Sequence, residues 1–85
     1  MGYSLSFEKL EVYQLSRSLV KWVYRVTSSF PEHQRFSLIN QLQRAAVSVA
    51  SNIAEGSGRQ HSKDKVHFIH IAYGSLMEVY CQLQI

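Results

Sequence analysis

The stretch that decides the fold is residues 36–58, which read FSLINQLQRAAVSVASNIAEGSG. Its apolar residues recur at steps of three and four, which is the spacing of one helix face. Alanines and valines between them cover most of the remaining circumference, and a helix that is apolar nearly all round is buried nearly all round. Gly56 and Gly58 follow, as glycines commonly do after a helix. The stretch predicts a central helix over about residues 36–55.

Two further amphipathic stretches flank the central one, over about residues 10–29 and 63–85. Each carries one apolar stripe at helical spacing, which we expect to face the core. The first stripe is Val12, Leu15, Leu19, Trp22 and Val26; the second is Ile69, Ala72, Leu76, Val79 and Leu83, joined by Val66, Tyr73 and Tyr80. Phe30-Pro31 is expected to end the first helix, and a polar turn, residues 32–34, to follow it. Ser62 is expected to cap the third helix.

Length and composition limit the class of protein. Eighty-five residues with one proline and four glycines predict a single all-α domain, residues 1–85, arranged as an antiparallel up-down bundle. So short a chain buries little of its surface, and its one cysteine, Cys81, forms no intrachain disulfide. Burial of apolar surface against other subunits is therefore the expected source of added stability. A lone cysteine is typical of the reducing cytoplasm, and neither a signal peptide nor a membrane span is evident.

Each outer stretch carries a second line of residues away from its main stripe. On the first it comprises Tyr13, Val20 and Tyr24; on the other it comprises His70, Gly74, Met77 and Cys81. Aligned exposed apolar residues usually mark interfaces, so these lines favour contact with other subunits. The alternative is a wide ordinary core with a few residues exposed by chance.

The central stretch also carries one polar seam at helical spacing. It comprises Gln41, Arg44, Ser48, Asn52 and Glu55, with Ser37 at its start. Polar groups on a buried helix must be hydrogen-bonded, so we expect a structural network in which Arg44 and Glu55 find partners on another helix or subunit. A ligand-binding seam is the alternative.

Nine Lys and Arg residues against six Asp and Glu give a net charge of +3. Two groups of cations are candidates for contact with nucleic acid. Arg17, Lys21 and Arg25 recur every four residues and share one helix face; Arg59, Lys63 and Lys65 cluster around the start of the third helix. Such groups bind phosphates without reading bases. A solvated face that serves only solubility is the alternative.

The sequence gives little support to enzyme or metal chemistry. His61, His67 and His70 lack partners at a standard ligand spacing, so no metal site is predicted. Cys81 is expected on a helix among apolar neighbours, where a thiol stays protonated and inert. We predict no catalytic residues, no cofactor and no enzyme activity.

The stretch from Gln41 to Arg59, with its Ser-Asn-Ile-Ala-Glu-Gly core, resembles the signature of the four-helix-bundle family of 23S rRNA intervening-sequence proteins, also called S23 ribosomal-like proteins. Residues 7–13 (FEKLEVY) resemble the opening motif of that family, Phe30-Pro31 its first turn, and residues 71–78 (IAYGSLME) its third helix. Ala50 departs from the pattern, because many relatives have proline there.

The resemblance implies an up-down bundle in a cyclic homo-oligomer, a pentamer, with the fourth helix of the family absent from these 85 residues. Members are encoded within insertions in ribosomal RNA genes, and related accessory proteins of diversity-generating retroelements bind reverse transcriptase and RNA through a basic ring. We therefore expect a non-enzymatic scaffold or accessory protein whose partners are its own copies and RNA or another nucleic acid. The alternative is a structural protein–protein interaction module with no nucleic-acid role.

Overall fold

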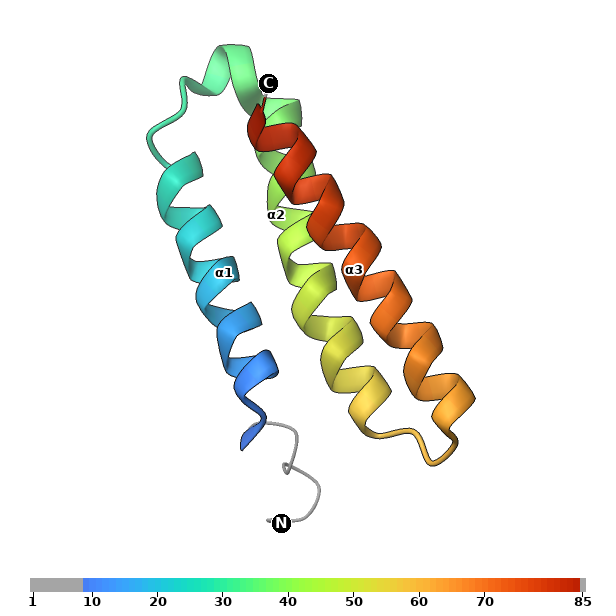
Figure 1. Cartoon of the computed structure of the whole chain (residues 1–85). Coiled ribbons are helices and arrows are strands. Elements are labelled where there is room, and N and C mark those ends of the chain that lie inside the picture. The colour runs from blue at the N-terminus through green and yellow to red at the C-terminus, as the bar shows by residue number, and fades with distance from the viewer. Residues whose placement is uncertain (1–8, 85) are drawn as a thin grey trace.

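The computed structural model describes residues 9–84, with side chains for all of these except residues 32–36. It contains three helices: α1 (Glu11–Thr27), α2 (Glu32–Ser57) and α3 (Ser62–Gln84). Successive helices run in opposite directions, so the predicted all-α up-down arrangement is confirmed (Figure 1). The first eight residues, which include the start of the opening motif, and Ile85 lie outside the described residues.

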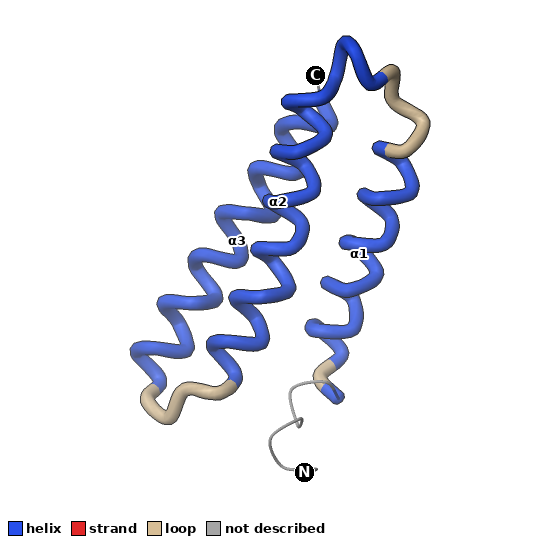
Figure 2. Tube along the Cα trace, turned by 180° about the vertical axis from the view of Figure 1, so that it is seen from behind, coloured by secondary structure: helices blue, strands red, loops and turns tan. Residues whose placement is uncertain are grey.

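The helices form an open layer with α2 in the middle. Both α1 and α3 pack against α2, whereas no Cα atoms of α1 and α3 approach within 8 Å of each other. Figures 1 and 2, which view the molecule from opposite sides, both show α2 between its two neighbours. The central position predicted for this helix is therefore confirmed. A layer of three helices has two broad faces, and neither face is covered by another helix of the described residues.

Helix α2 begins four residues earlier than predicted. Residues 32–34 were expected to form a turn, but the backbone is helical from Glu32. Pro31 immediately precedes the helix with φ −64° and ψ 119°. Proline interrupts a helix interior but is well tolerated at a helix start, where no earlier turn lies in its way. Similarly, Ser62 is the first residue of α3 rather than its cap, a difference of one residue.

The core is small and is centred on α2. One cluster joins Leu42, Ala45 and Ala46 of α2 to Val23 of α1 and Val79 of α3. A second cluster joins Val49 and Ile53 of α2 to Ala72 of α3, with Tyr13 and Leu19 of α1 packed against it. Both clusters contain residues from α2 and from its neighbours, so α2 holds the outer helices together.

The stripes predicted to be buried on α1 and α3 are mostly exposed, which corrects the prediction from the sequence. On α1 the side chains of Val12, Leu15 and Trp22 are 51%, 70% and 44% exposed, whereas Ser16, Val23 and Thr27 are buried. The reason is that α1 has a single neighbour, so it buries only the seam that faces α2. Tyr13 and Val20, predicted to contact another subunit, instead pack against the core.

Helix α3 shows the same departure. Of its predicted stripe only Ala72 and Val79 are buried. The exposed residues recur at alternating steps of three and four, as in the seam of a coiled coil: they are Val66, Ile69, Tyr73, Leu76, Tyr80 and Leu83. We refer to these residues, together with Val12, Leu15 and Trp22 of α1, as the open face.

Gly56 sets how closely α2 and α3 approach. It is buried, and a Cβ atom added there would lie 2.9 Å from the Cβ of Phe68 on α3. Real Cβ atoms do not come so close, so a side chain at this position forces the two backbones apart. Helix α2 ends one residue later at Ser57, and Gly58 caps it with φ −87°, a conformation that any residue adopts. Of the two glycines, Gly56 is therefore required for packing and Gly58 is not required for its backbone angle.

Candidate nucleic-acid interface

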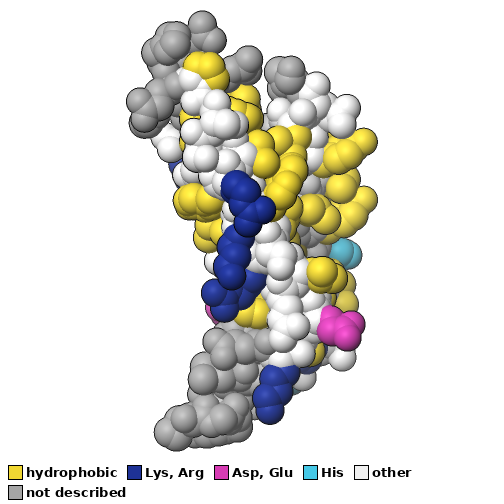
Figure 3. Space-filling view, turned by 90° about the vertical axis from the view of Figure 1, so that its left-hand side faces the viewer, with side chains coloured by type: hydrophobic (Ala, Val, Ile, Leu, Met, Phe, Trp, Pro, Cys, Tyr) yellow, Lys and Arg dark blue, Asp and Glu magenta, His cyan; other side chains and the backbone are white. Residues whose placement is uncertain are grey.

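Three cations lie along α1 and are open to solvent. Arg17, Lys21 and Arg25 are all exposed, and their spacing of four residues places them one above another on the helix surface. Figure 3 views the molecule from the side of α1 and shows a run of Lys and Arg side chains bordered by hydrophobic ones. The structure thus brings together the first group of cations that the sequence predicted.

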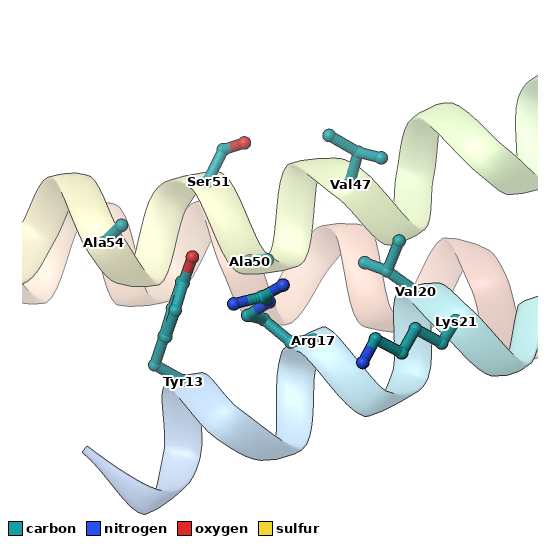
Figure 4. Close-up of a pocket in the computed structure, with 8 residues that line it drawn as sticks. All are labelled: Tyr13, Arg17, Val20, Lys21, Val47, Ala50, Ser51 and Ala54. Atoms are coloured by element: carbon teal, nitrogen blue, oxygen red, sulfur yellow. The ribbon is translucent and has the colours of Figure 1, made fainter. Parts of the chain in front are cut away.

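A hollow of about 370 Å³ lies beside two of these cations, between α1 and α2. It is lined by Tyr13, Arg17, Val20 and Lys21 of α1 and by Val47, Ala50, Ser51 and Ala54 of α2. Figure 4 shows the Tyr13 ring and the Arg17 side chain directed from α1 towards α2, with the Arg17 guanidinium close to Ala50. No lining residue is acidic, so the hollow combines an apolar floor with a cationic rim.

A second hollow, of about 400 Å³, continues along the same two helices. It shares Val47 with the first and is lined also by Tyr24, Asn40, Gln43, Arg44 and Ser48. It therefore repeats the combination of one tyrosine, one arginine and the apolar side chain of Val47. We call the two hollows and the three cations of α1 the basic face.

The second predicted group of cations does not join the basic face. Arg59 donates a hydrogen bond to Glu55 at 2.6 Å, and its guanidinium lies 4.8 Å from the centre of the Phe68 ring. Lys65 donates to the backbone oxygen of Ser57 at 3.4 Å. Lys63 is exposed. Arg59 and Lys65 thus make their contacts at the turn between α2 and α3.

Lys65 also lines a third hollow, of about 430 Å³, on the open face. The other lining residues are Leu10, Val12, Ile53, Gly56, Ser57 and Ile69. None of these residues lines the hollows of the basic face. The open face and the basic face are therefore separate surfaces.

The polar seam of α2 forms a network in part. The hydroxyls of Ser48 and Ser75 lie 2.8 Å apart, and the Asn52 amide donates to the Ser48 backbone oxygen and hydroxyl at 2.8 and 3.0 Å. Gln41 accepts a hydrogen bond from Gln82 at 2.9 Å. The Ser48–Ser75 and Gln41–Gln82 bonds tie α2 to α3, whereas the Asn52 bonds lie within α2.

The charged residues of the seam behave differently from the prediction. Arg44 and Glu55 are exposed, so neither is a buried charge that needs a partner on another element. Glu55 pairs with Arg59 just beyond the end of its own helix. Exposed pairs of this kind contribute little to stability, because water screens both charges.

The residues considered for metal and thiol chemistry are dispersed. Among residues 9–84, no group of three or more His, Cys, Asp or Glu side chains is placed to hold a metal ion. Cys81 was expected among apolar neighbours, but it is exposed, because it lies on the side of α3 away from α2. Within the same residues, no helix combines the length and the apolar character needed to cross a membrane.

The comparisons with known proteins agree with the resemblance seen in the sequence. A family model described as 23S rRNA-intervening sequence protein matches residues 8–85, nearly the whole chain. The chain belongs to this family. A search of curated proteins found no match to the chain. Membership of the 23S rRNA-intervening sequence family does not by itself assign a role to the basic face, which depends on the side chains described above.

The sequence analysis did not identify the residues that line the hollow beside the cations of the basic face. Tyr13 lies one helical turn before Arg17, so the spacing of four residues was a usable signal that the two share a face. Ser51 and Ala54 come from α2, and no local pattern shows which side of α2 meets α1. The packing of the two helices alone reveals them.

Proposed function

We propose that this protein is a non-enzymatic scaffold that assembles with copies of itself through the open face and binds nucleic acid through the basic face. The observation that carries the proposal is the separation of the two surfaces, whose hollows share no lining residue. Assembly through one surface leaves the other free, and repetition around an oligomer multiplies the cations presented to a phosphate backbone.

The open face supports the assembly part of this proposal. Tyr73 and Tyr80 are 61% and 59% exposed and belong to a row of apolar residues at coiled-coil spacing on α3, and Leu15 of α1 is 70% exposed. Contiguous apolar surface of this kind usually marks a contact with another chain. Its burial also supplies the stability that an 85-residue chain with a small core lacks.

The basic face supports the nucleic-acid part. Arg17, Lys21 and Arg25 are exposed and in line, and the hollow beside them has no acidic lining residue to compete with phosphate. Contacts of cations with phosphates do not depend on base sequence. We propose the cytoplasm as the place of action, because a single cysteine is typical of reducing compartments.

Binding of a labelled short oligouridylate, measured by fluorescence anisotropy over a range of salt concentrations, tests the nucleic-acid part. Three phosphate contacts on a single strand predict a slope of log affinity against log salt of about −2. A protein that shows no binding at low salt contradicts the proposal. Binding that is indifferent to salt contradicts it as well, because phosphate contacts release counterions.

A further inference from the structure

We propose that the hollow formed by Tyr13, Arg17 and the facing residues of α2 takes an unstacked base of a single nucleic-acid strand, with the neighbouring phosphates held by Arg17 and Lys21. This inference rests on the proposed function and adds to it. Phosphate binding alone calls for cations in water and gives no role to an apolar hollow among them. A base requires such a hollow, because its two faces are flat and apolar.

The lining residues match a base in chemical character. Tyrosine rings and arginine guanidinium groups are the flat surfaces on which unstacked bases lie. Tyr13 and Arg17 supply one of each, and both side chains project from α1 towards α2, with Arg17 beside the small side chain of Ala50 (Figure 4).

The size of the hollow favours a single strand. At about 370 Å³ it lies at the small end of the range for ligand sites, with room for a base but not for a duplex. Paired bases are stacked inside a duplex and do not reach a side pocket unless they flip out. The neighbouring hollow with Tyr24 and Arg44 repeats the same combination, so a strand that follows α1 meets a second place for a base.

An acidic peptide is the competing occupant, since it would also be attracted to Arg17 and Lys21. The two ligands differ in the contacts that they make with the hollow. A carboxylate gains nothing from the Tyr13 ring, whereas a base loses its stacking surface without it. The aromatic ring beside the cations therefore favours the nucleic-acid strand.

The experiment compares three labelled probes on the full chain by anisotropy: a short oligouridylate, the same strand with every base removed, and an RNA duplex of equal length. Stacking of one base is expected to make the oligouridylate bind at least about fivefold more tightly than the abasic strand. Equal affinity for the two strands overturns the base site and leaves the phosphate contacts standing. Failure of both strands to bind defeats the proposed function itself. A duplex that binds as well as the oligouridylate also overturns the base site.

Three variants locate the effect. Ala54 lines the hollow from α2 and is half-buried, so Ala54→Leu fills part of the hollow without removing a cation. This variant should abolish the preference for the base-bearing strand and leave the affinity for the abasic strand unchanged. Gln60 is exposed in the turn after α2, so the control Gln60→Leu should change neither affinity. Tyr13→Phe keeps the ring and should keep the preference. A preference that survives Ala54→Leu, or an oligoglutamate that competes better than the oligouridylate, contradicts the inference.

Discussion

Val12 of α1 and Ile69 of α3 line the same hollow, although the two helices do not pack against each other. Both side chains are about half exposed, at 51% and 48%. Ile53 of α2 forms part of the floor between them. The hollow is thus a groove with apolar walls and an apolar floor, which is the form that receives another helix. This relationship makes the open face the surface through which we expect the chain to assemble.

Leu15→Glu tests that expectation. Leu15 is 70% exposed, so a charge there costs the isolated chain little, but it places an unpaired charge inside an assembled interface. The variant should lower the mass measured by analytical ultracentrifugation and keep its helical circular dichroism. Asn40→Glu carries the same added charge at an exposed site that lines a hollow of the basic face, and it should leave the mass unchanged. Equal masses for all three proteins would exclude the open face as the interface.

The two helical glycines Gly56 and Gly74 provide a matched pair. Alanine at either position gains the same helix propensity, about 1 kcal/mol. At Gly56 the new Cβ meets Phe68 at 2.9 Å, whereas at Gly74 nothing lies within 4 Å. Gly56→Ala should therefore be less stable than Gly74→Ala by about 1–3 kcal/mol in urea unfolding at one protein concentration. Equal stabilities would mean that α2 and α3 pack less closely than described.

Reversal of charge on the basic face should weaken binding of nucleic acid without dissociating the protein. Arg17→Glu combined with Lys21→Glu places repulsive charges beside the hollow, and we expect the affinity for oligouridylate at low salt to fall by at least tenfold, about 1.4 kcal/mol. Arg59→Glu combined with Lys63→Glu changes the net charge equally near the turn between α2 and α3, at residues that line neither the basic-face hollows nor the open-face hollow. A similar loss in both double variants would show that binding responds to net charge alone. A drop in mass for the first would place these cations in a subunit interface.

The polar seam of α2 separates into residues that contribute to stability and residues that do not. Ser75→Ala removes the hydrogen bond to Ser48, which is worth about 1 kcal/mol and is partly offset by the helix propensity of alanine. Arg44 is exposed, so Arg44→Ala should change the free energy of unfolding by less than about 0.5 kcal/mol. An Arg44 charge buried against a partner, as the sequence led us to expect, would instead lose about 3–5 kcal/mol on substitution. Thermal or urea unfolding of both variants measures the difference, and a larger loss for Arg44→Ala would show that its charge is buried on assembly.

The sequence predicted the helices well because each has a strong local signal. Apolar spacing gave α1 and α3 to within about two residues at each described end, and α2 ends at Ser57, two residues later than predicted, with Gly56 inside the helix. The start of α2 was wrong because Pro31 was taken only as the end of one helix, although it also precedes the next. The predicted core was wrong for a different reason. Val12 and Leu15 repeat at core spacing, but spacing alone does not show whether the covering surface belongs to the same chain.

The candidate site was predictable only in its charges. Arg17, Lys21 and Arg25 share a helix face by spacing alone, so the sequence was sufficient to group them. It grouped Arg59 and Lys65 by proximity along the chain, and it gave no sign that an ion pair and a backbone carbonyl hold them at the turn. Tertiary packing determines which cations are bonded and which lie beside a hollow, because it determines which helix faces meet.

The most direct test of the account is the mass of the protein in solution, measured by light scattering with and without a short oligouridylate. The account predicts a multiple of the chain mass that rises when the oligonucleotide is added and returns to its first value in high salt, because the apolar assembly persists while phosphate contacts weaken. A monomer that ignores the oligonucleotide would contradict both parts of the proposed function. An assembly that ignores it would contradict the nucleic-acid part alone.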